Sequence, residues 1–365
     1  MEFNRAEISQ QDTENGRSLL GESLTGDQPG SVNQQIHQSS KDSKTKKDSV
    51  LKLSVLFILS FVVIGLVQLL GWVGKGQVDP WVPNLTVLQM TAIIASGIQI
   101  IMFIPAFIFQ TEKFYDLTGT MTYIVCSAYS FAGGYVQSIQ RQGNSVDIRA
   151  ILATCFVGIW SLRLGSFLFI RVLQSKKDGR FDEIKPSFVK FFITWNIQGL
   201  WVFLGCMPTF ILNSTQLDFG FVWTDVVGGI LFCFGFLGEV IADEQKKAFN
   251  AQQQNKGKWI NVGLWRKSRH PNYFCEWVLQ FGLFVFASAE YTDSQWIAVL
   301  SPIFVAFLLA FISGVPLLEQ RADEKWGDVE AYQVYKRNTS VCIPLPQLGH
   351  GRELADKLCI PSFLV

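Results

Sequence analysis

The sequence predicts an all-α membrane protein, a polytopic helix bundle with about eight transmembrane helices. Of its 365 residues, 49% are hydrophobic and 17% are charged, whereas soluble domains carry about 25% charged residues. The charges separate long apolar segments, and a helix that crosses a bilayer needs about 20 such residues. The net charge of +1 gives no indication of nucleic-acid binding.

The chain begins with a polar segment over residues 1–49, rich in Ser, Gln, Asn, Asp and Glu. This composition cannot bury enough apolar surface to fold, so it predicts a disordered tail. The first apolar segment starts too far along the chain for a cleaved signal peptide. Four lysines near the end of the tail predict that it stays cytosolic; they are Lys41, Lys44, Lys46 and Lys47.

The membrane domain is expected over 50–346, with a cofactor-binding half at 149–346 and a cytosolic C-terminal tail at 347–365. The seventh of its apolar segments is short for a full crossing. The predicted spans are 52–72, 86–109, 120–140, 149–173, 189–212, 221–242, 276–289 and 295–315.

Lysine and arginine gather in alternate loops, which predicts a cytosolic N-terminus and a cytosolic cofactor site. The endoplasmic reticulum is the expected membrane. Two sequons test this topology, because only luminal sites are glycosylated. Asn213 is expected in an outer loop and modifiable, whereas Asn338 is expected on the cytosolic side.

The seven cysteines do not predict a disulfide framework or a metal site. Four of them, Cys126, Cys155, Cys206 and Cys233, lie in apolar segments and are expected to be small buried hydrophobes. Soluble nucleotide-binding motifs such as GxGxxG and GxxxxGK[ST] are missing. A nucleotide would therefore be held by arginine and lysine at its phosphates and by tyrosine or tryptophan at its rings.

Charged residues also occur inside predicted spans. Arg163 lies in the fourth span, and Glu239 and Asp243 lie four residues apart at the end of the sixth, on one helix face. A charge in a span is costly unless it is paired or hydrated. Arg163 is therefore predicted to pair with Glu239 or Asp243 beside a polar cavity that opens to the cytosol. The alternative is an ion pair that only locks helix packing.

The densest polar segment is 266–276, RKSRHPNYFCE. One interpretation is a basic loop bound to lipid headgroups. The mixture of residue types favours a dinucleotide site, because it offers a cationic fork in Arg269, an amide in Asn272 and an acid in Glu276. Further along, Tyr332 and Tyr335 share a helix face, where they either pack at the membrane interface or contribute to binding.

Together these segments form an ordered series that is similar to a known family. SRHPNYFCE, preceded by Gly-Leu-Trp, resembles the signature of the steroid 5-alpha-reductase-like membrane reductases, and most closely the DUF1295 family. The resemblance runs from Tyr115 to Pro346. Its other matching pieces are Arg163-Leu164, the loop 177–182, Trp195 with Gln198, Asp243 with Gln245 and Lys246, and the segment 332–344.

The resemblance implies an NADPH-dependent reductase of a carbon–carbon double bond in a lipid-like substrate: a steroid, a fatty acyl chain or an isoprenoid. Proton donation is expected from a tyrosine, with Tyr273, Tyr123 and Tyr115 as candidates and His270 tuning the donor. Tyr273 and His270 are the implied catalytic residues. The implied cofactor-binding residues are Arg163, Asp243, Lys246, Trp265, Arg269, Asn272, Tyr273 and Glu276.

One residue departs from the family pattern, and two alternative functions stay open. Family members often have glycine at the position of Cys275, and the larger cysteine side chain would narrow the pocket. Membrane methyltransferases that use S-adenosylmethionine share the Arg-His-Pro-x-Tyr segment, but they carry a later pair of glutamates where this chain has Glu319-Gln320. A non-catalytic membrane protein is the third possibility. The expected partners are the lipid-like substrate and membrane lipids, and no protein partner is indicated.

Overall fold

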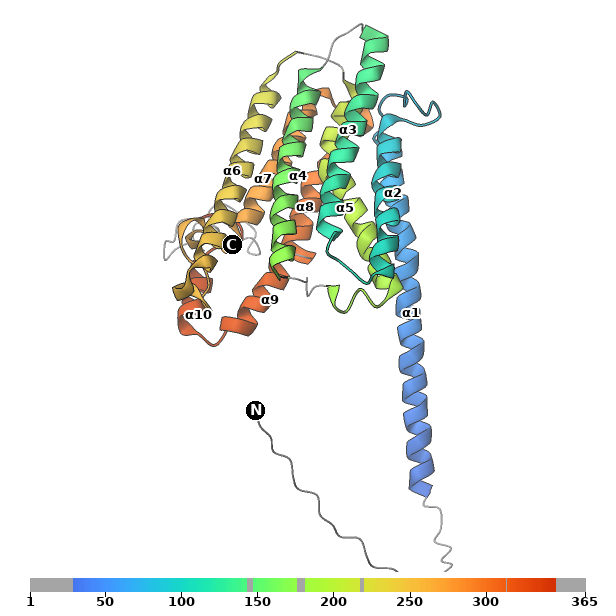
Figure 1. Ribbon diagram of the computed structural model, residues 1–365, viewed down its shortest axis with the longest axis vertical. Coiled ribbons are helices and arrows are strands. Elements are labelled where there is room, and N and C mark those ends of the chain that lie inside the picture. The colour runs from blue at the N-terminus through green and yellow to red at the C-terminus, as the bar shows by residue number, and fades with distance from the viewer. Residues whose placement is uncertain (1–28, 143–146, 176–180, 217–219, 313, 346–365) are drawn as a thin grey trace, which may run out of the picture. The chain divides into compact units, whose positions relative to one another are not determined.

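The computed structural model describes residues 29–142, 147–175, 181–216, 220–312 and 314–345. The chain divides into a unit that ends at Lys52 and a unit from Leu53 to Val365, which holds the bundle. Apart from two isolated bridges, the regular structure of the described residues is helical (Figure 1). The predicted all-α class is confirmed.

The long helices alternate in direction along the bundle. They are α1 (Pro29–Val73), α2 (Val87–Ile108), α3 (Tyr115–Gln142), α4 (Ile148–Ser175), α5 (Phe188–Thr215), α6 (Trp223–Ala251) and α7 (Pro271–Ala287). The shorter ones are α8 (Leu300–Phe307), α9 (Val315–Trp326) and α10 (Glu330–Asn338), with the 3-10 turns η3 (Gly263–Arg266), η4 (Ser288–Glu290) and η5 (Asp293–Val299) and the π turn η6 (Leu308–Ile312).

Six helical segments of the described residues are long and apolar enough to cross a membrane, which makes this an integral multi-pass protein. They are Ser49–Val73, Val87–Ile108, Ile148–Ile170, Phe188–Thr215, Trp223–Ala251 and Asp293–Trp326. The two other predicted spans are helices too. However, α3 is more polar, and α7 has only 17 residues. The count of eight crossings therefore stays a prediction.

The polar tail differs from its prediction where the structure describes it. Residues 29–49 belong to α1 and are helical rather than disordered. Extending an existing helix costs far less than starting one, and Gln and Lys are good helix formers. The predicted tails 1–28 and 347–365, and residues 176–180 of the basic loop, lie outside the described residues.

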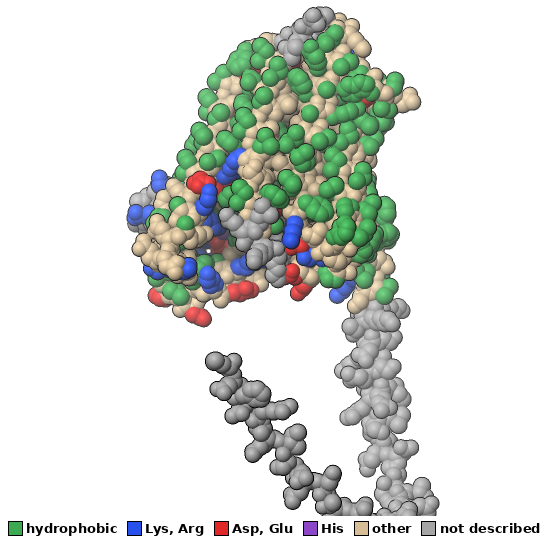
Figure 2. Space-filling model, viewed as in Figure 1, with side chains coloured by type: hydrophobic (Ala, Val, Ile, Leu, Met, Phe, Trp, Pro, Cys, Tyr) green, Lys and Arg blue, Asp and Glu red, His purple; other side chains and the backbone are tan. Residues whose placement is uncertain are grey.

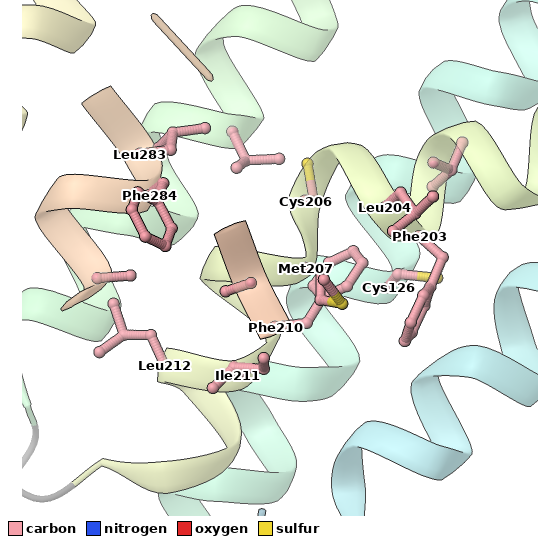
Figure 3. Packing of buried hydrophobic residues seen from close by; sticks show 14 of the residues in the cluster. Cys126, Phe203, Leu204, Cys206, Met207, Phe210, Ile211, Leu212, Leu283 and Phe284 are labelled. Atoms are coloured by element: carbon pink, nitrogen blue, oxygen red, sulfur yellow. The ribbon is translucent and has the colours of Figure 1, made fainter. Parts of the chain in front are cut away.

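Helix α5 is the centre of the bundle. It packs against α2, α3, α4, α7 and α8, and 83% of the residues in its most apolar stretch are buried. A helix that is apolar all round lies either in a protein core or in lipid, and most of α5 is covered by its neighbours. Figure 3 shows Phe203, Met207 and Phe210 of α5 near Cys126 of α3, in a buried cluster that also includes Leu283 of α7.

The two ends of the bundle differ. We call the end that carries η3, α9 and α10 the cap end, and the opposite one the far end. Lys, Arg, Asp and Glu side chains gather at the cap end in Figure 2, whereas the rest of that face is largely hydrophobic. The α6–α7 connection lies at the cap end, so α7 begins where α6 finishes (Figure 1).

At the far end of the bundle, the prediction that Asn213 lies in an outer loop is wrong. Asn213 lies within α5 rather than in an outer loop, and its side chain is fully buried. Its Nδ2 donates to Ser130 Oγ and Thr154 Oγ1, each at 3.0 Å. A buried amide that binds three helices together is not available for glycosylation. Asn338, by contrast, is exposed at the end of α10.

Candidate functional site

Arg163 lies in the middle of α4 and contacts two carboxylates of α6. Its Nη1 is 2.6 Å from Glu239 Oε1, and its Nη2 is 2.5 Å from Asp243 Oδ2. The side chain of Arg163 is 19% exposed, and those of Glu239 and Asp243 are 4% and 8% exposed. The predicted pairing of Arg163 is therefore confirmed, in a cluster whose carboxylates are buried and whose arginine reaches the surface.

Glycines bring α7 directly against α6. A Cβ on Gly235 would lie 2.5 Å from Leu279 N, and one on Gly282 would lie 2.5 Å from Phe232 N. Backbone contact of this kind is typical of small residues between membrane helices. The Sγ of Cys275 lies 2.6 Å from the position of a Cβ on Gly238. Cys275 therefore fills the α6–α7 interface.

This packing brings α7 to the Arg163 cluster. Asn272 Nδ2 donates to Asp243 Oδ1 at 3.2 Å. Glu276 lies one turn further along the same face of α7 and is 9% exposed. Four of the predicted cofactor residues, on three helices, are thus gathered in one place. They are Arg163, Asp243, Asn272 and Glu276.

The parallel helices α4 and α6 meet at three levels that repeat every seven residues. Arg149 contacts Asp225 at 2.6 Å, Phe156 stacks on Phe232 with ring centroids 4.4 Å apart, and Arg163 contacts Glu239. Such a heptad repeat keeps one face of each helix toward the other. We call these three contacts the α4–α6 ladder. It places a second arginine cluster at the far end.

The far-end cluster was missed in the sequence. Arg149 donates from Nε and Nη2 to Asp225 at 2.6 and 3.0 Å, from Nη1 to Glu290 at 2.8 Å, and to the carbonyl oxygen of Gly220. The side chain of Arg149 is 5% exposed, and both acids are fully buried. The sequence contains one signal that could have revealed it: Arg149 and Arg163 are 14 residues apart, as are Asp225 and Glu239.

Arg269 belongs to a different cluster at the cap end. Its Nε is 3.0 Å from Glu319 Oε1, and its Nη1 donates to the carbonyl oxygens of Lys336 and Thr339, each at 2.6 Å. Two of its three nitrogens are thereby engaged with α9 and the end of α10. These contacts give Arg269 a role in holding the cap onto α7.

The segment 339–345, which we call the C-terminal strap, runs beside residues 267–270. Arg269 N donates to Ser340 O and His270 N to Val341 O, both at 2.9 Å, and Ser268 Oγ donates to Cys342 O at 2.7 Å. Backbone hydrogen bonds fix the strap irrespective of its side chains. The residues that precede α7 are therefore positioned by the end of the membrane domain.

His270 lies directly before α7 and is 5% exposed. Its Nε2 is 2.8 Å from Glu319 Oε1. Burial lowers the pKa of His270, and although Glu319 opposes this shift, Lys246 and Arg269 add to it. In the neutral ring Nε2 carries the proton toward the carboxylate. Nδ1 is then an acceptor, and it has no partner within the described residues.

Trp265 connects η3 to the end of α6. Its Nε1 donates to Ala242 O at 2.9 Å, and Tyr335 OH donates to its carbonyl oxygen at 2.7 Å. The indole is 3% exposed, with Lys246 Nζ 4.6 Å from its ring centroid. Trp265 is thus enclosed. It contacts Lys246, which lies one turn beyond Asp243 on α6.

The three candidate tyrosines have different surroundings. Tyr273 stacks on His270, with ring centroids 5.7 Å apart, and Tyr115 OH donates to Thr194 O at 3.0 Å. Tyr123 is buried in α3, with its ring 5.1 Å from that of Trp160. The Trp201 side chain lies beside the Tyr123 hydroxyl, which has no acceptor within the described residues.

Other predicted residues have packing contacts. Tyr332 is 2% exposed and lies 5.3 Å from Trp259 and 5.9 Å from Trp326 between ring centroids, so it packs within the cap. Cys126 and Cys206 are buried as predicted. Cys155 and Cys233 are exposed, because they lie on the outer faces of α4 and α6.

One family model matches the chain, over residues 102–339; it is described as "Protein of unknown function (DUF1295)". The match covers the bundle from the last two turns of α2 to α10, including the Arg163 cluster and the 266–276 segment. The chain belongs to the DUF1295 family. No curated protein and no solved structure matches it. The strap residues that bond to 268–270 begin where the family match finishes.

Proposed function

We propose that this DUF1295 protein is an NADPH-dependent reductase of a carbon–carbon double bond in a lipid-like substrate. The observation that carries the proposal is the convergence of Arg163, Asp243, Asn272 and Glu276, because these residues come from three separate segments that resemble the steroid 5-alpha-reductase-like enzymes. Burial strengthens their interactions with any polar ligand.

The residues present fit a dinucleotide. Lys246 is the cation beside the start of α7, where a helix N-terminus favours phosphate. The amide of Asn272, the carboxyl of Glu276 and the acceptor Nδ1 of His270 suit a carboxamide and ribose hydroxyls. In this proposal Arg269 positions the segment and contacts no phosphate. The bound cofactor would supply hydride, and the protein would orient the reactants and exclude water.

The reaction also needs a proton donor toward the substrate. We assign this role to Tyr123, because its buried hydroxyl has no acceptor within the described residues. A donor in a dry site stabilises charge that develops on a conjugated carbonyl oxygen. Tyr273 would position His270 through ring stacking.

A methyltransferase that uses S-adenosylmethionine is the second candidate. The observation that favours it is Glu319, which contacts both Arg269 and His270 and so joins the Arg-His-Pro segment to the later acid. The surplus of carboxylates around Arg163 would also suit a sulfonium cation.

Thermal unfolding of the purified protein separates the candidates. A ligand at 100 times its Kd stabilises the folded state by about 2.7 kcal/mol. We expect a rise in Tm with NADPH and none with S-adenosylmethionine. The reverse result would support the methyltransferase, and no rise with either would favour a non-catalytic protein.

Adjacent lysines provide a matched control for this experiment. Lys246→Gln should weaken NADPH binding about tenfold, a loss of about 1.4 kcal/mol. Lys247→Gln should leave binding unchanged, because Lys247 is 65% exposed and pairs with Glu244 at the surface. Equal effects of both variants would contradict the assignment of Lys246.

We further propose that the cap end faces the cytosol from the endoplasmic reticulum membrane, on the basis of the distribution of lysine and arginine. Asn338 is a suitable reporter because it is exposed. It should remain unglycosylated when its sequon is extended by a linker, and modification there would reverse the orientation.

A further inference from the structure

Carboxylates outnumber cations in the Arg163 cluster. Arg163 contacts Glu239 and Asp243 through its two Nη atoms. Glu276 forms no hydrogen bond or ion pair within the described residues, although it is 9% exposed. Lys246, one turn beyond Asp243, is the additional cation at this level. Three acids thus face two cations, and a buried surplus of negative charge is unfavourable.

The packing of α6 on α7 places Glu239 opposite Glu276. These helices are antiparallel, and Asp243 contacts Asn272 at 3.2 Å. Glu239 lies one turn before Asp243, and Glu276 lies one turn after Asn272, so both lie one turn deeper on the faces that meet. The contact between Gly238 and Cys275 confirms this register on the neighbouring positions.

Two buried atoms beside this pair lie next to each other. Nε1 of the fully buried Trp160, which lies one turn from Arg163 on α4, interacts with the Glu239 carboxylate, but Trp160 Nε1 and Glu239 Oε2 form no well-aligned hydrogen bond within the described residues. A buried carboxylate whose hydrogen bonds are imperfect is costly, and a proton on the carboxylate lowers this cost.

We propose that Glu239 and Glu276 share one proton and that this carboxyl pair reloads Tyr123 during the reduction. Two carboxylates that face each other away from water do not both ionise readily. The inference rests on the proposed function for its last step, whereas the shared proton stands on the geometry alone.

The proton transfers balance as follows. Hydride from NADPH, with its two electrons, forms a C–H bond at one alkene carbon, and the π electrons move to the conjugated carbonyl oxygen. The Tyr123 O–H bond breaks as its proton passes to that enolate, which tautomerises to the saturated carbonyl. The carboxyl pair then protonates the tyrosinate and regains a proton from cytosolic water.

The groups that act on the pair come from each element packed around it. Tyr123 of α3 contacts Trp160, with ring centroids 5.1 Å apart, and Trp160 lies beside Glu239. The titratable or charged groups that face the pair are Tyr123 of α3, Arg163 of α4, Asp243 of α6 and Cys275 of α7; Lys246 acts on Asp243, and Cys206 of α5 acts on Tyr123.

Infrared difference spectroscopy of the full chain in lipid nanodiscs tests the shared proton without any ligand. A protonated carboxylic acid gives a carbonyl band that shifts in D2O. We expect this band in the parent and its loss in Glu276→Gln. Glu183→Gln is the matched control, because Glu183 is exposed. No band in the parent, or a band retained in both Glu276→Gln and Glu239→Gln, would overturn the proposal.

Proton release tests the coupling to the reaction. NADP⁺ carries a positive nicotinamide ring that NADPH lacks, so its binding should release on the order of one proton per chain to an indicator dye. NADPH should release none, and Glu276→Gln should abolish the release. NADP⁺ binding without release would overturn the relay. If neither NADP⁺ nor NADPH binds, the proposed function and the relay are both refuted. The infrared experiment needs no ligand, so it would still show whether Glu239 and Glu276 share a proton.

Discussion

Helix α4 carries two arginine clusters that share a design and differ in completeness. Arg149 and Arg163 each contact one carboxylate of α6 at 2.6 Å and a second acid nearby. At the far end, all three guanidinium nitrogens of Arg149 are hydrogen-bonded. At the cap-side cluster, Glu239 Oε2 and the neighbouring Trp160 Nε1 interact but form no well-aligned hydrogen bond in the described ranges.

This difference suggests a structural role for the Arg149 cluster, which we call the far-end clamp, and a ligand-binding role for the Arg163 cluster. A buried charge group whose hydrogen bonds are all satisfied rigidifies the fold. One whose hydrogen bonds are imperfect, and whose arginine is 19% exposed, has capacity for a ligand. The α4–α6 ladder therefore uses the same pair of residue types for stability at one end and for the proposed chemistry toward the other.

The largest expected effect is on the clamp. Arg149→Leu would leave Asp225 and Glu290 buried without a cation, which should cost about 3–5 kcal/mol of unfolding free energy. Denaturant unfolding in detergent measures this loss. Arg141→Leu, at an exposed position of α3, should change stability by less than about 0.5 kcal/mol. A variant at Arg149 as stable as the parent would remove the distinction between the two clusters.

Arg163→Leu should destabilise less, by about 2 kcal/mol, because Arg163 itself is 19% exposed and the buried carboxylates that it leaves can take up protons. NADPH binding should fall by at least about tenfold in the same variant. Glu244→Gln controls for loss of charge at an exposed ion pair of α6. Unchanged cofactor binding in Arg163→Leu would reduce this cluster to a second clamp.

Acid should weaken the cap. The pKa of His270 is lowered on folding by burial, so the unfolded chain binds more protons. Stability is then complete above the unfolded pKa of about 6.5 and declines as the pH falls below it, by at most about 1.4 kcal/mol per pH unit. His270→Gln should flatten this decline between about pH 7 and pH 5. An equally steep decline in the variant would assign it to other groups.

Neutral substitutions should have the smallest effect. Asn272→Ala and Tyr273→Phe change no charge, so a loop bound to lipid headgroups would tolerate both. In a cofactor site, each removes a hydrogen bond of about 1 kcal/mol, or roughly fivefold in NADPH affinity. Titration of both variants with NADPH measures this. Parent-like affinity in both would favour the headgroup loop.

Much of this architecture was predictable because the bilayer imposes it. Apolar length located the helices, and the cost of a charge within a span correctly paired Arg163 with α6. The family resemblance was also correct. The relation to steroid 5-alpha-reductases and the cofactor remain predictions.

Tertiary contacts decided what the sequence left hidden. Arg269 looked like a phosphate-binding fork, but it is engaged by Glu319 and by backbone carbonyl groups of α10 and the strap, about 50 to 70 residues later in the chain. Asn213 looked like a loop sequon, but α5 extends past it to Thr215. Arg149 looked like a boundary residue, and only the ladder with α6 shows its role.

Because the C-terminal strap is synthesised late, the two ends of the bundle are completed at different times during synthesis. The far-end clamp has all its side chains once Glu290 has been made. The segment before α7 acquires its backbone partners only when Ser340 and Val341 have been added. The bundle is thus anchored at one end while the proposed cofactor site is still open at the other, so premature termination within α10 would yield an inserted protein with an unfinished site.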